Sequence, residues 1–166
     1  MSLRPSSPTP FPQPPRTLKL FVTFLGIGNL PKAPGTWAAA AALIPAAALV
    51  YLGGILLLGL AIVLVTIAAI PACTAYCRTT GKDDACEIVI DEVIGVWIAV
   101  LILPQTFLAW ALGFVFFRLF DILKPGPVAW AEQGFGGGLG VMADDVVAGI
   151  LAAMLSALIL VFLTNA

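Results

Sequence analysis

The sequence predicts an all-α integral membrane protein: a helical bundle of about five spans plus a short interfacial N-terminal helix. Of its 166 residues, 61% are hydrophobic and 10% are charged, whereas a typical soluble domain has about 25% charged residues. The apolar residues also form long runs joined by short turns, and about 20 such residues cross a bilayer as a helix. The length suits a single domain over 17–166, after a tail at 1–16.

The N-terminal region is expected to lie outside the membrane core. Residues 1–16 are rich in Pro and Ser, a composition typical of a disordered tail. Residues 17–30 are weakly apolar and too short to span, so we expect an interfacial or re-entrant helix on the cytoplasmic side. Pro31 and Pro34 end it, and Thr36 suits the N-cap of the first span.

The first two spans come from one long apolar run, Trp37 to Cys77. Its 41 residues are about twice the ~20 needed for one crossing, so the chain must turn within it. The pair Gly53-Gly54 is the turn signal. We therefore expect spans at 37–51 and 55–77.

The third and fourth spans are expected at 88–103 and 106–121. Pro104 ends the third span, and the fourth ends by Lys124 because two prolines follow it closely. With the preceding pair, they form two helical hairpins.

The last span is expected at 145–163. The Gly-rich segment 134–140 before it predicts a flexible loop. Asp144 and Asp145 would then stand at the start of the last span, where one Asp is an ordinary N-cap. A second carboxylate is not needed for capping.

All ionisable side chains fall on one side of this predicted topology. The turns after the first and third spans and the C-terminal Thr164-Asn165-Ala166 carry no charge. Lys and Arg mark the cytoplasmic side of a membrane protein, so we expect the N-terminus inside and the C-terminus outside. The basic residues are Arg4, Arg16, Lys19, Lys32, Arg78, Lys82, Arg118 and Lys124.

Several acids fall just inside predicted helix ends, where carboxylates are costly and usually functional. Asp84, Glu87 and Asp91 are spaced to share one helical face, with Glu92 beside them. Carboxylates in a first turn also complement the helix dipole, but apolar residues precede the Asp91-Glu92 pair, so we favour a functional role for it. The predicted metal ligands are Asp84, Glu87, Asp91, Glu92, Asp121, Asp144 and Asp145, of which all but Asp84 and Glu87 are also predicted to be catalytic.

Basic groups and a helix start are predicted on the same face. Arg118, Asp121 and Lys124 recur every third residue and project to a common side. Backbone N–H groups at the start of the first span could bind an anion, with Lys32 and Thr36 as further donors. Carboxylates without a metal would repel one another, and hard oxygen ligands suit Mg²⁺. These groups predict metal-assisted phosphoryl transfer or hydrolysis at the lipid surface.

Four ordered motifs resemble those of the phosphatidylglycerophosphatase A family. The resemblance implies a bacterial inner-membrane, multi-pass, Mg²⁺-dependent lipid phosphatase whose active site faces the cytoplasm. It would hydrolyse phosphatidylglycerophosphate to phosphatidylglycerol and phosphate. The motifs are Gly-Asn-Leu-Pro-Lys-Ala-Pro-Gly-Thr (28–36), Ile-Val-Ile-Asp-Glu-Val-Ile-Gly (88–95), Phe-Arg-Leu-Phe-Asp-Ile-Leu-Lys-Pro-Gly-Pro (117–127) and Gly-Gly-Leu-Gly-Val-Met-Ala-Asp-Asp-Val-Val-Ala-Gly (137–149).

Other mechanisms and classes are disfavoured. A net charge of −1 argues against nucleic-acid binding, and the lack of His excludes a phosphohistidine intermediate. A small cation-binding transporter would carry ionisable groups near mid-membrane, and a lipid-headgroup phosphotransferase would carry an Asp-Gly-x2-Ala-Arg signature that is missing here. Oligomeric state, metal number and the choice between water and a carboxylate as nucleophile stay open.

Overall fold

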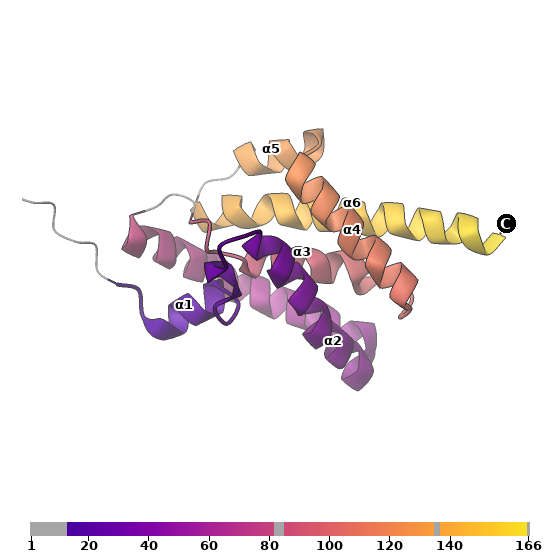
Figure 1. Cartoon of the computed structure of the whole chain (residues 1–166), viewed down its shortest axis with the longest axis horizontal. Helices are drawn as coiled ribbons and strands as arrows, with labels where there is room; N and C mark the ends of the chain where they lie inside the picture. Colours follow the sequence, from indigo (N-terminus) through magenta and orange to yellow (C-terminus); the bar gives the residue numbers. More distant parts are fainter. Residues whose placement is uncertain (1–12, 82–84, 135–136, 166) are drawn as a thin grey trace, which may run out of the picture.

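The computed structural model describes residues 13–81, 85–134 and 137–165, and every regular element in these ranges is helical (Figure 1). This confirms the all-α prediction for the described residues. Most of the predicted tail at 1–16 lies outside them. The elements are α1 (Arg16–Val22), the 3₁₀ turn η1 (Ile27–Asn29), α2 (Pro34–Thr80), α3 (Ile90–Leu101), α4 (Phe107–Leu123), α5 (Gly126–Gly134) and α6 (Gly137–Asn165).

Helix α2 is a hairpin of two helical legs. Gly53 and Gly54 leave the helical conformation, and Gly54 has a φ of 68° that favours glycine. The chain reverses there, and the second leg returns toward the end where the first began (Figure 1). The predicted turn is confirmed, and the legs extend beyond 37–51 and 55–77.

Two helices, α2 and α6, are long and apolar enough to cross a membrane. Helix α3 has 12 residues and α4 has 17, or about 18 and 26 Å at 1.5 Å per residue. A bilayer hydrocarbon core is about 30 Å thick. The described residues contain two helices of membrane length. The five crossings therefore stay a prediction.

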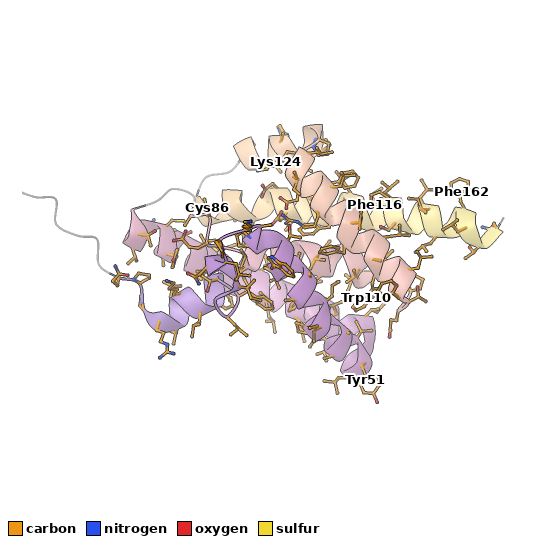
Figure 2. All side chains as sticks on the ribbon, viewed as in Figure 1. Tyr51, Cys86, Trp110, Phe116, Lys124 and Phe162 are labelled. Atoms are coloured by element: carbon orange, nitrogen blue, oxygen red, sulfur yellow. The ribbon has the colours of Figure 1, made fainter. Side chains whose placement is uncertain are left out.

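Large apolar side chains cover much of the outer surface of the bundle. Tyr51 is 89% exposed, Phe107 is 92% exposed and Phe162 is 68% exposed. Figure 2 shows Tyr51, Phe116 and Phe162 at widely separated places on the helices. Apolar surface this extensive marks an interaction site rather than a water-facing surface.

Helix α3 forms the centre of the bundle. It packs against α2, α4 and α6, and most of its residues are buried. The Trp97 Nε1 group donates a hydrogen bond to the Ala42 carbonyl oxygen at 2.8 Å, which ties α3 to the first leg of α2. A helix that is shielded by its neighbours does not have to match the bilayer thickness, because its ends are surrounded by protein rather than by lipid.

Two glycines let α3 and α6 approach closely. A Cβ atom added at Gly149 would overlap the Gly95 carbonyl oxygen, and one added at Gly95 would overlap the Phe117 ring. Small residues commonly line such close helix contacts in membrane proteins. This contact holds the N-terminal half of α6 beside the start of α3.

The N-terminal region differs from the single helix predicted at 17–30. Helix α1 ends at Val22, and Phe24 and Leu25 both have positive φ values before η1 begins. Left-handed residues cannot continue a right-handed helix. The segment is therefore two short helical pieces joined by a tight turn.

The start of the first span also differs from the prediction. Ala33, rather than Thr36, occupies the N-cap of α2, and it makes no side-chain capping hydrogen bond. Pro34 stands in the first turn, where its fixed φ favours helix initiation and its missing N–H costs nothing. Thr36 is therefore inside the first turn.

The largest correction concerns the Gly-rich segment 134–140. Helix α6 begins at Gly137, so most of the predicted loop is helical, and Asp144 and Asp145 lie inside α6 rather than at its start. Helix α5, which was not predicted, packs against α6. Tertiary packing of this kind stabilises helices whose intrinsic propensity is low, and it outweighs the glycines here.

Candidate metal and phosphate site

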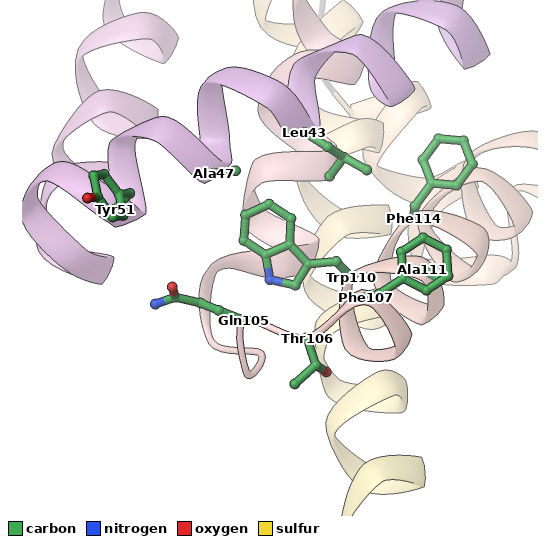
Figure 3. Close-up of a pocket in the computed structure, with 9 residues that line it drawn as sticks. All are labelled: Leu43, Ala47, Tyr51, Gln105, Thr106, Phe107, Trp110, Ala111 and Phe114. Atoms are coloured by element: carbon green, nitrogen blue, oxygen red, sulfur yellow. The ribbon is translucent and has the colours of Figure 1, made fainter.

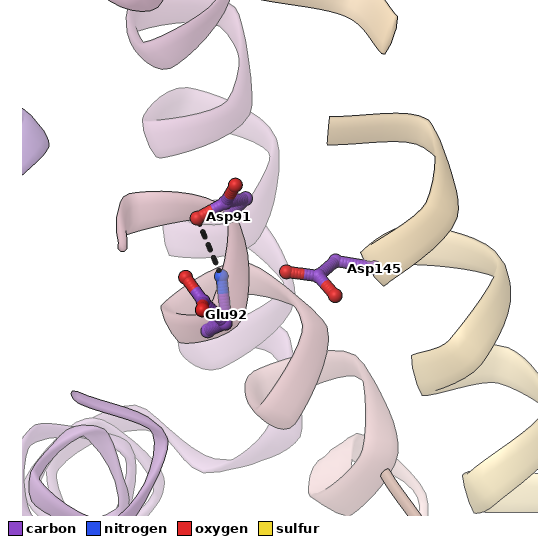
Figure 4. Close-up of side chains that lie close together, drawn as sticks. All are labelled: Asp91, Glu92 and Asp145. Atoms are coloured by element: carbon purple, nitrogen blue, oxygen red, sulfur yellow. Dashed lines mark hydrogen bonds between the residues drawn. The ribbon is translucent and has the colours of Figure 1, made fainter. Parts of the chain in front are cut away.

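Five carboxylates from three helices converge on one region. They form two groups in which one oxygen of each residue lies within 4.8 Å of the others: Asp91, Glu92 and Asp145, and then Asp121, Asp144 and Asp145. Asp145 belongs to both groups. Figure 4 shows Asp145 on α6 facing Asp91 and Glu92 on α3. The structure thus brings together the five residues that the sequence predicted to be catalytic.

The acids of α3 lie in its first turn. The helix begins at Ile90, with Val89 as its N-cap, two residues later than the predicted start at 88, so only Ile90 precedes the pair within the helix. Asp91 Oδ1 accepts a hydrogen bond from the Glu92 backbone N–H at 3.0 Å. The helix dipole stabilises negative charge at this position. Helix α3 alone therefore explains the pair, and the case for a site rests on what faces it.

Asp145 on α6 is the carboxylate that faces the Asp91-Glu92 pair. It is 3% exposed, and among the described residues no hydrogen-bond donor reaches its buried Oδ1 atom or the buried Glu92 Oε2 atom. A buried carboxylate oxygen without a partner is unfavourable. Oxygen-rich donor sets of this kind suit Mg²⁺, so the residues present fit the ion that the sequence predicts.

Basic side chains partly offset the carboxylates. Arg118 Nη1 lies 2.5 Å from Asp121 Oδ2 and 3.9 Å from Glu92 Oε1. Lys124 Nζ donates to Asp144 Oδ2 at 3.0 Å. Five acidic and two basic side chains leave the cluster with a formal charge of −3. Like charges repel more strongly in a low-dielectric interior than in water, so the cluster favours further cations.

The N-terminus of α2 borders the same cluster. A Cβ added at Gly35 would overlap Glu92 Oε1 and would lie 3.3 Å from Arg118 Nη1. Thr36 follows in the first helical turn, and Lys32 is exposed on the segment that leads into the helix. The N–H groups and the dipole of a helix N-terminus favour anions. A phosphate could therefore bind where α2 begins.

Of the two remaining predicted ligands, only Glu87 is among the described residues, and it belongs to neither carboxylate group. Glu87 lies in a turn before α3 rather than on a shared helical face, and its Oε1 accepts a hydrogen bond from the Tyr76 hydroxyl at 3.3 Å. Asp84 lies outside the described residues. The sequence reasoning assigned no role to Gly35, although its place in Pro-Gly-Thr immediately before an expected helix was a usable signal.

A separate pocket of about 670 Å³ lies at the opposite end of α3 (Figure 3). Helix α3, which separates the two regions, is about 18 Å long. The pocket is largely apolar and belongs to a different part of the bundle from the carboxylates. Its lining residues are Leu43, Ala47, Tyr51, Gln105, Thr106, Phe107, Trp110, Ala111 and Phe114.

The fold and the cluster define an all-helical protein, with two helices long and apolar enough to cross a membrane and an acidic candidate metal site beside basic groups. The family model for phosphatidylglycerophosphatase A matches residues 20–160. The chain belongs to the phosphatidylglycerophosphatase A family. The four motifs of the sequence lie within the matched range, so the resemblance that they indicated is confirmed.

Named relatives agree with this assignment. Phosphatidylglycerophosphatase A of Escherichia coli is 45% identical over 82 residues, a match that covers 46% of this chain and 48% of the relative. The Haemophilus influenzae protein of the same name is 34% identical over 136 residues, 81% of this chain and 83% of the relative. A Bacteroides thetaiotaomicron protein, named provisionally as a phosphatidylinositol-3-phosphatase, is 37% identical over 150 residues, 83% of this chain and 90% of the relative. No solved structure significantly matches the chain.

Proposed function

We propose that this protein is a Mg²⁺-dependent lipid phosphatase that hydrolyses phosphatidylglycerophosphate to phosphatidylglycerol and phosphate. The observation that carries the proposal is the convergence of five carboxylates, Arg118 and Lys124 beside the N-terminus of α2. The names of the Escherichia coli and Haemophilus influenzae relatives support the choice of substrate. A phosphate monoester needs cations on several sides, and this arrangement can supply them.

The carboxylates of the cluster would hold the metal: Asp91, Glu92, Asp121, Asp144 and Asp145. When bound, Mg²⁺ supplies positive charge that polarises a phosphoryl group and activates water. A metal would also compete with Arg118 and Lys124 for their carboxylate partners. These two side chains would then be able to bind phosphate oxygens through charge-assisted hydrogen bonds.

The start of α2 would complete the phosphate site. Its first N–H groups have no helical partner upstream, and Gly35 lets the helix end approach Glu92 and Arg118 without a side chain in between. Thr36 and the exposed Lys32 are the further donors on this side. The scissile phosphate would bind between α2 and the carboxylates, with the lipid chains directed along the apolar helix surfaces.

We also propose that the protein has five crossings of a bacterial inner membrane, with the site at the cytoplasmic face. The turn at Gly53-Gly54 and the C-terminal end of α6 carry no charged side chain, whereas Arg118 and Lys124 adjoin the carboxylates at the other end of the bundle. Basic residues mark the cytoplasmic side. The short buried helix α3 counts as one of the five crossings because its neighbours shield it from lipid.

A reporter that is active only in the periplasm, fused after Ala166, is expected to be active in cells, because five crossings separate the chain ends. The same reporter fused after Thr80, at the end of α2, is the control and should be inactive. The measurement is reporter activity per unit of membrane-inserted fusion protein. Activity of only a cytoplasmic reporter after Ala166 would contradict the five-span topology.

The catalytic proposal is tested with purified protein and lipid phosphates. We expect phosphate release from phosphatidylglycerophosphate to need Mg²⁺, to fall at least ~100-fold when a chelator removes the ion, and to return when Mg²⁺ is restored, a loss of about 2.7 kcal/mol in transition-state stabilisation. Phosphatidylinositol 3-phosphate is the second substrate because one relative is named for it. Faster hydrolysis of that lipid would reassign the substrate, and undiminished activity in chelator would contradict the metal requirement.

A further inference from the structure

We infer that the acidic site holds two divalent cations that share Asp145 as a ligand. The inference deepens the proposed function, because it specifies the metal content of the same site. Its starting point is that the five carboxylates fall into two groups of three rather than one group of five within the described part of the chain. Asp145 is the residue common to both.

The two groups are built from different helices. Asp91 and Glu92 belong to α3, Asp121 belongs to α4, and Asp144 precedes the shared Asp145 on α6. Within each group the oxygens lie within 4.8 Å of one another. Two oxygens on opposite sides of one Mg²⁺ are about 4.2 Å apart, because Mg–O bonds are about 2.0–2.1 Å long. Each group can therefore close on one ion with small side-chain adjustments.

The state of Asp145 gives an independent reason for a shared ligand. Asp145 is 3% exposed, and its Oδ1 atom has no hydrogen-bond donor in the part of the chain that the structure describes. Its backbone N–H donates to Asp144 Oδ1 at 3.0 Å, which holds the Asp144 carboxylate against the backbone of α6. A buried carboxylate with an unpartnered oxygen between two carboxylate groups is suited to bridge two cations.

Charge balance favours two ions over one. The cluster with Arg118 and Lys124 has a formal charge of −3, so one dication leaves −1 and two give +1. A phosphate monoester carries about −1.5 to −2 at neutral pH. A site with one ion would repel it, whereas a site with two ions would attract it. Two-metal centres occur in other phosphatases, where the ions stabilise the attacking and leaving oxygens.

The experiment uses Mn²⁺ as a paramagnetic probe of the purified full-length protein in detergent. We expect two Mn²⁺ per chain at saturation, with an electron paramagnetic resonance spectrum that shows spin coupling, because ions in two-metal sites lie about 3.5–4 Å apart. Asp91→Asn and Asp121→Asn each remove a ligand from one group only. Each variant should retain one Mn²⁺ and lose the coupling, whereas Asp145→Asn should weaken both sites.

Glu87→Gln is the matched control, since it removes a nearby carboxylate that belongs to neither group. It should keep two coupled ions. Saturation of the unaltered protein at one uncoupled Mn²⁺ would overturn the inference, whatever the variants do, and so would an unchanged coupled spectrum in Asp145→Asn.

Phosphate release from phosphatidylglycerophosphate is measured on the same preparations to separate this inference from the proposed function. Two coupled ions in a protein that does not hydrolyse the lipid would support the two-ion site and contradict the proposed substrate. Normal Mg²⁺-dependent hydrolysis with a single bound ion would overturn the two-ion site and leave the proposed function standing.

Discussion

Asp145→Asn is expected to lower kcat for phosphatidylglycerophosphate hydrolysis by at least ~100-fold at saturating Mg²⁺, or about 2.7 kcal/mol of transition-state stabilisation. The substitution preserves size and removes the charge that both carboxylate groups share. It also relieves repulsion within a buried acidic cluster, and replacing an uncompensated buried charge tends to stabilise a fold. The variant should therefore be folded, with a thermal midpoint at or above that of the unaltered protein.

Ser156→Ala is the matched control for this prediction. Ser156 lies further along α6, is fully buried, and has a hydroxyl oxygen with no hydrogen-bond partner. Its replacement changes a buried polar group on the same helix without altering the carboxylates, so kcat should stay near normal. If the kcat of Asp145→Asn lies within a few-fold of that of the control at saturating Mg²⁺, Asp145 is not part of the catalytic site.

Local features of the chain were predictable from sequence because short-range physics decides them. The reversal at Gly53-Gly54 follows from an apolar run too long for one crossing. The end of α4 follows from the prolines that succeed Lys124. The pairing of Arg118 with Asp121 follows from a spacing of three residues on one helix.

Features that depend on tertiary packing were not predictable. The glycines of 134–140 favour a loop locally, but helix α6, which packs against α5, already begins at Gly137. The start of α3 was also predicted wrongly. The helix begins at Ile90, so Glu87 lies in a turn and does not share a helical face with Asp91. In both places the local pattern predicts a different structure from the one observed.

The candidate site combines both kinds of information. Its acids were identifiable because carboxylates are rare in an apolar chain and indicate function there. Their division into two groups was not, because it depends on how α3, α4 and α6 meet. The contact of Lys124 with Asp144 joins residues that are 20 positions apart, and no periodic pattern links them.

A substitution at the glycine contact between α3 and α6 is expected to lower both stability and activity. We expect Gly149→Ala to destabilise the protein by about 1–3 kcal/mol, the usual cost of overpacking, and to lower activity at least ~10-fold. The added Cβ would overlap the Gly95 carbonyl oxygen and lie 3.1 Å from Ile98 Cβ, so α6 must move away from α3. That movement separates Asp145 from the carboxylates of α3.

Gly59→Ala provides the comparison that makes this result specific. It adds the same methyl group to a helical glycine, but apart from the helix's own backbone no described atom lies within 4 Å of the new one. Ala is favoured over Gly inside a helix by about 0.5–1 kcal/mol, so this variant should be as stable as the unaltered protein or slightly more so, with unchanged activity. Thermal midpoints in detergent and phosphate release measure the two effects. Equal behaviour of the two variants would show that close approach at Gly149 does not position Asp145, whereas loss confined to Gly149→Ala would tie the site to this helix contact.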